Sequence, residues 1–249
     1  MANYILGNAK LWWEGYDLSG RLKSIALAVA QEAKDNTVFA STAMRTFLPG
    51  LKSHSLSYSG YHDTVSTTTL RPDKYIQAEY GSAGTVVTVS HDGGDVGEKA
   101  WSMYCNTSEY TPVDGEVGDV AAFSLNATGT DKMFMGIIME NGQETSSATG
   151  TAREIYGLDD TDVAYMVIHC TELDATSLDI VVSSDTVATM DNSASERDFS
   201  QVQFTAVGSQ YLTYTAASDL SADDCWRVDS TITGGNTTAT YTVNLYIPA

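Results

Sequence analysis

The chain has 249 residues and a formal net charge of −19, which excludes a protein built to grip the phosphates of nucleic acid. The charge is uneven, because residues 1–153 carry 17 acidic and 11 basic residues, whereas residues 154–249 carry 15 and 2. Gly, Ser and Thr are plentiful and apolar residues rarely recur at helical spacing, so we expect a mostly β fold with at most one or two short helices.

The cysteines and the N-terminus set further limits. Cys105, Cys170 and Cys225 are odd in number and widely spaced, which predicts buried free thiols in a reducing compartment instead of a disulfide framework. The first residues lack the basic region and apolar core of a secretory signal, and no apolar run approaches the ~20 residues of a membrane helix. We therefore expect a soluble protein made in the cytoplasm.

The first half of the chain begins with an apolar stretch at 4–16, which predicts a strand or arm, and residues 21–30 then alternate as a strand. Residues 37–47 fit either a loop or a short helix. Residues 51–60 alternate again and place four serines on one side. That face is too polar for a core and too uncharged for a typical solvated surface, so it suits contact with a neighbouring subunit; an ordinary surface strand is the alternative.

Further strands are predicted at 85–89, 99–104 and 120–125. Residues 133–139, Met-Phe-Met-Gly-Ile-Ile-Met, are apolar throughout, so this strand belongs in a core or an interface. Residues 141–153 are small and polar, and we predict a linker or flexible loop there.

The second half holds six short strand-like segments separated by turns. This pattern predicts a small β-sandwich. We therefore expect a β-sandwich or barrel-like domain at 1–153, which makes the subunit contacts, followed by an acidic sandwich-like unit at 154–249. The six segments are 163–170, 177–182, 199–207, 210–215, 224–230 and 238–247.

No catalytic constellation is visible, so we expect no enzyme. The four histidines are not accompanied by a nucleophile elbow, a metalloprotease motif or a phosphate-binding glycine loop. His169 lies in an apolar run, where a core or interface position is favoured. Asp92-Gly-Gly-Asp95 could hold Ca²⁺ weakly, although ordinary turn chemistry explains it better. We expect no cofactor and no metal, and Trp12, Trp13, Trp101 and Trp226 as core or interface anchors.

Several segments resemble the major tail tube proteins of long-tailed, non-contractile bacteriophages. In the N-terminal half these are Asp17-Leu-Ser-Gly20, Asp35-Asn-Thr-Val-Phe39, Arg45-Thr-Phe-Leu-Pro-Gly-Leu-Lys52 and Ser57-Tyr-Ser-Gly-Tyr-His-Asp63. Later in the chain they are Gly115-Glu-Val-Gly-Asp-Val-Ala-Ala-Phe123, Ser177-Leu-Asp-Ile-Val-Val-Ser-Ser-Asp185, Phe199-Ser-Gln-Val-Gln-Phe-Thr-Ala-Val207 and the closing strand.

The resemblance implies a virion tail subunit, assembled in the host cytoplasm, whose copies form hexameric rings stacked into a hollow tube. It also implies contact with the tape measure, the terminator and the baseplate or tip, while DNA passes through without specific binding and no membrane is involved. A tube of this kind would use exposed side chains between copies. The candidate subunit contacts are Thr37, Phe39, Arg45, Phe47, Leu51, Tyr58, Tyr61, Met133, Met135 and Ile137.

Two alternatives remain open from the sequence. One is another virion component, such as a capsid decoration or tail-terminator protein. The other is a carbohydrate-binding or glycan-hydrolysing β-protein, for which the adjacent Trp12 and Trp13 are the support.

Overall fold

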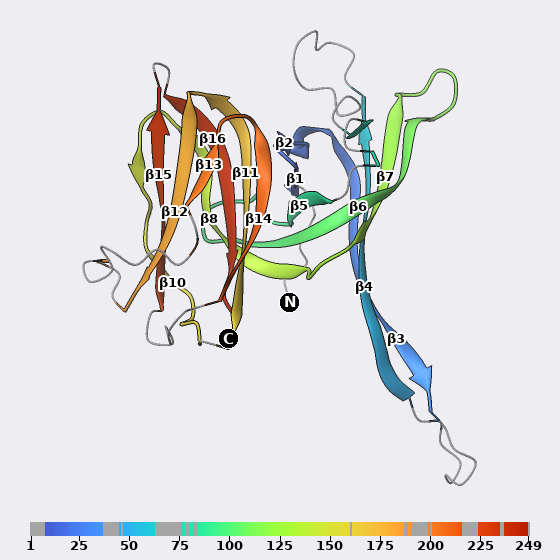
Figure 1. The fold of residues 1–249 in the computed structure, drawn as a ribbon. Helices are drawn as coiled ribbons and strands as arrows, with labels where there is room; N and C mark the ends of the chain where they lie inside the picture. The colour runs from blue at the N-terminus through green and yellow to red at the C-terminus, as the bar shows by residue number, and fades with distance from the viewer. Residues whose placement is uncertain are drawn as a thin grey trace. The chain divides into compact units, whose positions relative to one another are not determined.

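A computed structural model shows an all-β chain (Figure 1). It describes residues 8–36, 45, 47–62, 76–77, 80–81, 84–159, 161–186, 189–190, 199, 201–215, 224–234 and 237–248. Within these residues no helix reaches seven residues: helical backbone occurs in the 3₁₀ turn η1 (Ser19–Arg21) and at residues 76–77. The prediction of a mostly β fold is confirmed.

The strands of the first half follow the predicted alternating segments, because period-two patterns place one set of side chains on each face. They are β1 (Lys10–Trp13), β2 (Tyr16–Asp17), β3 (Leu22–Asp35), β4 (Phe47–Tyr61), β5 (Thr85–Ser90), β6 (Lys99–Asp114), β7 (Ala122–Gly129) and β8 (Phe134–Glu144).

The longer strands of the second half also lie on the predicted segments, although the described part of 199–207 is a strand only over three residues, whereas the short strands β9 and β10 were not predicted. They are β9 (Ala148–Thr149), β10 (Arg153–Glu154), β11 (Val163–Asp174), β12 (Ser177–Asp185), β13 (Val202–Phe204), β14 (Gly208–Thr215), β15 (Cys225–Thr233) and β16 (Thr238–Tyr246).

The strands form two antiparallel sheets. The larger sheet has 11 strands with the path β14-β11-β16-β8-β6-β5-β1-β2, from which β3, β4 and β7 branch through β6. The smaller sheet has five strands, in the order β10-β15-β12-β13 with β9 beside β15. Residues far apart in sequence meet in register, as Ile137 does with Leu245 between β8 and β16.

Contacts divide the chain into two interleaved units. Unit 1 contains residues 1–20, 85–104 and 133–249, and unit 2 contains residues 21–84 and 105–132. This division does not follow the predicted boundary between 153 and 154, because β11 and β16 pair into the same sheet as β8. The roles assigned to 1–153 and 154–249 stay predictions.

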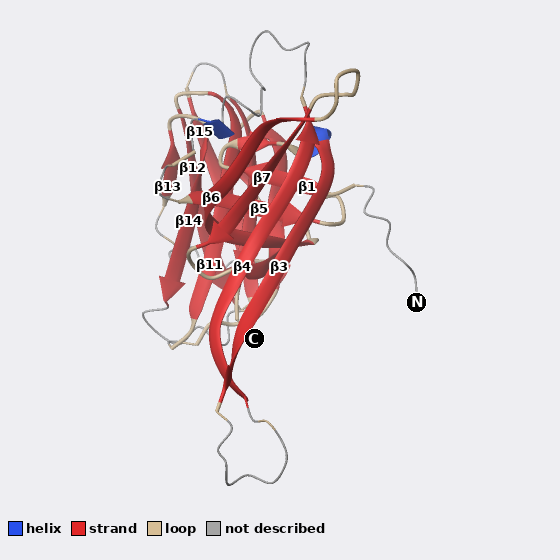
Figure 2. Cartoon of the chain, turned by 90° about the vertical axis from the view of Figure 1, so that its right-hand side faces the viewer, coloured by secondary structure: helices blue, strands red, loops and turns tan. Residues whose placement is uncertain are grey.

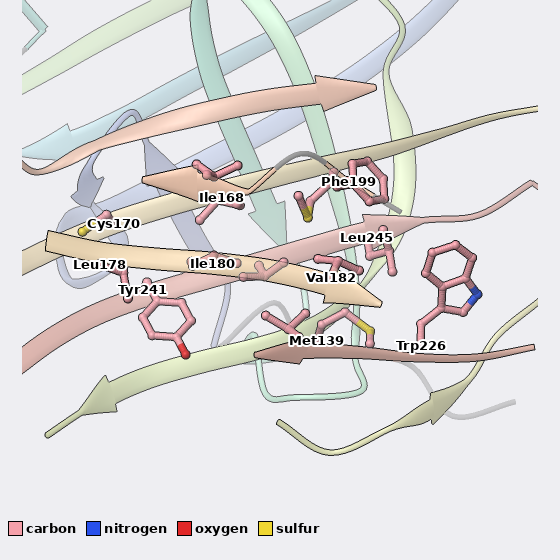
Figure 3. Packing of buried hydrophobic residues seen from close by; sticks show 14 of the residues in the cluster. Met139, Ile168, Cys170, Leu178, Ile180, Val182, Phe199, Trp226, Tyr241 and Leu245 are labelled. Carbon is pink, nitrogen blue, oxygen red and sulfur yellow. The ribbon is translucent and has the colours of Figure 1, made fainter. Parts of the chain in front are cut away.

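The main core lies in unit 1, where side chains from both sheets pack together (Figure 3). Met139 on β8, Ile168 on β11 and Leu245 on β16 meet Ile180 on β12 and Trp226 on β15 in one buried cluster. Burial of these apolar faces away from water supplies most of the driving force for such a fold. The sandwich predicted for the second half therefore exists, but strands of the first half complete it.

The prediction of a linker at 141–153 is wrong. Residues 141–144 extend β8, with Gly142 in register with Tyr241, and short strands β9 and β10 pair with β15. Gly150 fits here because a Cβ atom would stand 2.2 Å from the carbonyl oxygen of Val228. Gly150 therefore reflects a close approach of backbone to β15.

Several predictions about buried residues are confirmed. Cys105, Cys170 and Cys225 are free and buried, and His169 is fully buried. Trp12, Trp13 and Trp226 are also core residues, while Trp101 is half-buried. The Trp12–Trp13 pair therefore packs inside the protein and does not form an exposed sugar-binding platform.

Candidate subunit-contact surface

The longest feature of unit 2 is a two-stranded ribbon formed by β3 and β4. The two antiparallel strands pair from Leu22 opposite Gly60 to Asp35 opposite Phe47, with register shifts on the way. Figure 2 shows them running side by side along their length. We call the region where Asp35 meets Phe47 the ribbon end. A strand rises about 3.3 Å per residue, so the 14 residues of β3 span roughly 45 Å.

One face of the ribbon consists of small uncharged side chains. Ala26, Ala28 and Ala30 on β3 stand opposite Ser57, Ser55 and Ser53 on β4. These residues are exposed, and the hydroxyl groups form bonds within the face, as in the 2.7 Å bond from Ser57 Oγ to Asn126 Oδ1. The predicted serine face is therefore present and uncovered in the single chain.

The opposite face of the ribbon contributes to the core of unit 2. Leu56 and Tyr58 are buried, and the Tyr58 ring meets Phe123 edge-to-face with centroids 5.3 Å apart. Burial raises the pKa of Tyr58, with Arg21 opposing the shift. Burial lowers the pKa of His54 on the same face, partly countered by Asp131. Both effects favour neutral side chains here.

Exposed apolar side chains gather at the ribbon end. We define the end patch as Phe47, Leu48 and Leu51, all of which are exposed, with Leu51 at 81%. Val29 is also exposed, but it lies opposite His54, farther along the ribbon. Basic side chains accompany them, since Arg45 and Lys52 are exposed and Lys34 forms an ion pair with Glu32 at 2.7 Å. Apolar groups flanked by charge are typical of protein contact surfaces.

A second apolar group lies at the other extremity of the ribbon, where Tyr61 is in register with Ala122. We define the loop patch as Tyr61 together with Val113 near the end of β6 and Val117 and Val120 of the β6–β7 connection; all are exposed, Val113 at 71%. Gly115 and Gly118 adopt left-handed φ values of 131° and 107°, which glycine tolerates best, and so shape this loop.

The loop patch borders an open groove of about 290 Å³. Its lining includes the carboxylates of Asp114 and Asp119 and the Lys23 ammonium, which stands 5.5 Å from the centre of the Tyr61 ring. Glu116 adds a third exposed carboxylate to the loop. The groove is thus acidic with apolar sides, whereas the ribbon end is apolar with a slight excess of positive charge.

The net charge lies almost entirely in one unit. Unit 1 contains 22 acidic and 5 basic residues, a net of −17, whereas unit 2 contains 10 and 8, a net of −2. Like charges on two approaching copies repel, so the nearly neutral unit 2 is the better surface for close contact between copies.

The structure places the predicted contact residues in different settings. Arg45, Phe47, Leu51 and Tyr61 are exposed on unit 2, whereas Tyr58 is buried inside it at 2% exposure and cannot meet another copy without unfolding. The three residues of unit 1 differ from one another: Met135 is exposed, Met133 is half-buried, and Ile137 packs on the main core. Thr37 and Phe39 lie outside the described residues.

Sequence reasoning missed Val29, Leu48 and the three valines of the loop patch. The exposure of Val29 follows from the fold, because Val29 pairs with His54, just beyond the point where β7 stops pairing with β4 at Ser55. The loop valines carry no periodic signal, so only the fold reveals their exposure.

Membrane-spanning helices and metal-binding clusters are both absent from the residues that the structure describes. None of the helical segments in this part of the chain is long and apolar enough to cross a bilayer. Within the same residues no three His, Cys, Asp or Glu side chains gather in a way that could hold a metal ion.

No protein-family model and no curated protein matches the chain. Among solved structures, the tail of an empty gene transfer agent particle with C6 symmetry is 16% identical with a TM-score of 0.40, over 54% of this chain and 98% of that one. The sheath–tube complex of an extracellular contractile injection system is 11% identical with a TM-score of 0.42, over 54% of this chain and 92% of that one. The Dit protein of phage SPP1 is 12% identical with a TM-score of 0.37, over 96% of this chain and 99% of that one. These TM-scores are all below 0.5, so the likenesses are distant and carry no argument about function.

Proposed function

We propose that the chain is a structural protein of a phage-like tail, and specifically the major tail tube subunit, whose copies form rings stacked into a hollow conduit for DNA. The segments that carry the sequence resemblance support this role. Arg45–Lys52 contains Phe47, Leu48 and Leu51 of the ribbon end, Ser57–Asp63 includes Tyr61 of the loop patch, and Gly115–Phe123 includes Val117 and Val120 of the same patch.

The observation that carries the proposal is the distribution of exposed apolar side chains. Nine of the twelve large apolar residues that are exposed in the described part of the chain belong to unit 2, although unit 2 is the smaller unit. Such side chains in water favour association, because a contact removes their surface from solvent. A subunit that completes its burial against its own copies explains this distribution.

The charge of the chain fits a conduit for DNA. Carboxylates repel the phosphate backbone, so an acidic wall lets DNA slide, whereas a wall rich in Lys and Arg would bind it and resist transit. We propose no enzymatic activity and no cofactor. The proposed partners are further copies in hexameric rings, the tape measure, the terminator and the baseplate or tip.

Electron microscopy of the concentrated protein tests the proposal. The expected image is an open-ended tube with a central channel, formed by the protein alone. A single closed ring that never stacks would favour a terminator or hub component of the tail. A monomer that persists at high concentration, and that is absent from purified tails, would contradict the proposed function.

A further inference from the structure

We propose that the ribbon end of one copy docks into the groove beside the loop patch of the next copy. This inference rests on the proposed function and deepens it by assigning the two surfaces that join successive copies. The occupant of the groove is therefore a second copy of this chain, bound through its Arg45, Leu51 and Lys52 region.

The first support is the position of the exposed apolar groups in unit 2. Of its nine exposed large apolar residues, three form the end patch and four form the loop patch. The end patch begins where Asp35 pairs with Phe47, and the loop patch begins where Tyr61 pairs with Ala122. They therefore occupy opposite extremities of one β-ribbon, so one chain cannot bury both against each other.

The second support is complementary charge. The groove and its loop present Asp114, Glu116 and Asp119 against the single Lys23 ammonium, which already lies over the Tyr61 ring. The ribbon end presents Arg45, Lys52 and Lys34 against Glu32 and Asp35, and Lys34 is paired with Glu32. An end-to-groove contact joins unlike net charges, whereas an end-to-end or groove-to-groove contact joins like charges.

The third support is symmetry. A contact between two different patches of the same chain is heterologous, and it leaves one free end patch and one free loop patch after each addition. Such contacts close into a ring or continue as an open stack according to the rotation between copies, and we assign them to the open stack because the two patches lie at opposite extremities of the ribbon. This is the geometry that joins one layer of subunits to the next.

Charge reversal tests the contact directly. The groove variant is Asp114→Lys with Asp119→Lys, and the end variant is Arg45→Glu with Lys52→Glu. Each variant alone places like charges at the proposed contact, so we expect at least a tenfold rise in the concentration needed for tube formation. In an equimolar mixture, the positive ribbon end of the groove variant can meet the acidic groove of the end variant. The negative ribbon end of the end variant can likewise meet the basic groove of the groove variant. We therefore expect the mixture to assemble as the unchanged protein does.

The matched control for the groove variant is Asp92→Lys with Asp95→Lys, which changes the charge of the chain by the same amount and sign at exposed positions of unit 1. We expect the control variant to form tubes normally, and circular dichroism checks that every variant is folded. Tubes from both reversed variants at the unchanged concentration, or loss of assembly that mixing does not rescue, would overturn the inference. Failure of the unchanged protein to assemble would instead contradict the proposed function.

Discussion

His169 and Thr88 are joined by a buried hydrogen bond of 2.8 Å between the ring Nε2 and the hydroxyl Oγ1. The other ring nitrogen, Nδ1, stands 2.6 Å from the carbonyl oxygen of Glu14. A carbonyl oxygen can only accept, so Nδ1 carries the proton and Nε2 accepts from Thr88. The neutral tautomer of His169 is therefore fixed by its two partners.

The bond from Thr88 continues through the interior of unit 1. Asn244 Nδ2 donates to Ser102 Oγ at 2.7 Å, and Ser102 Oγ stands 2.7 Å from Thr88 Oγ1. Since Thr88 gives its hydrogen to His169, Ser102 must donate to Thr88. These donors point toward His169, and a proton added at Nε2 would turn this nitrogen into a donor, so Thr88 could no longer donate to it.

Acid should therefore destabilise the fold through His169. Burial lowers its pKa from 6.5 to about 4, with the bond to Glu14 opposing the shift. The unfolded state binds the proton first as pH falls below 6.5, so the free energy of unfolding declines between pH 6.5 and 4 by about 3 kcal/mol from this residue. The contribution of neutral His169 to the free energy of unfolding is fully present above pH 6.5.

Denaturant unfolding of the unchanged protein and of His169→Gln at pH 7, 5.5 and 4 measures this contribution. We expect the stability advantage of the unchanged protein to shrink as pH falls, because the variant lacks the titrating group. His91→Gln removes an exposed histidine and should follow the unchanged protein. An advantage that stays constant with pH would show that His169 does not carry the effect.

Gly15 should tolerate no side chain. A Cβ atom there would stand 2.3 Å from the amide nitrogen of Gly208 and 2.9 Å from the carbonyl oxygen of Cys170, and both neighbours are backbone atoms that cannot rotate away. Gly15→Ala should therefore destabilise unit 1 by about 1–3 kcal/mol or more through overpacking.

Gly20→Ala is the matched control, because nothing lies within 4 Å of the added Cβ atom. We expect this variant to unfold within about 0.5 kcal/mol of the unchanged protein. Thermal unfolding of both variants by circular dichroism makes the comparison. Equal stability of the two variants would mean that β1, β2 and β14 can separate locally at little cost.

Most strands could be predicted, because the alternation of side chains between two faces is visible within a single segment such as 51–60. The grouping of strands into sheets could not be predicted, since pairs such as Ile137 with Leu245 depend on contacts a hundred residues apart. The same limit explains the wrong linker at 141–153. Small polar residues predict a flexible loop by composition, yet here Gly150 allows close packing against β15.

The contact surface could be predicted in part. Leu51 has the same parity along β4 as Ser53, Ser55 and Ser57, whereas Tyr58 has the opposite parity. Period-two geometry therefore separates these two predicted contacts onto different faces, and only one face of a sheet usually covers a core. Applying that constraint would have excluded Tyr58 from the surface. It would not have found Val117, which lies in a turn without a period.

Two leucines of β4 should separate folding from assembly. Leu56 is completely buried, so Leu56→Ala should lower the free energy of unfolding by about 2–5 kcal/mol through lost burial and the cavity left behind. Leu51 is exposed in the end patch, so Leu51→Ala should change stability by less than about 0.5 kcal/mol. Leu51→Ala should nevertheless raise the concentration needed for tube formation, because the side chain loses its partner surface in the next copy.

Denaturant unfolding below the assembly concentration, followed by light scattering above it, measures both effects on one preparation. Normal assembly by Leu51→Ala would remove the end patch from the contact between copies.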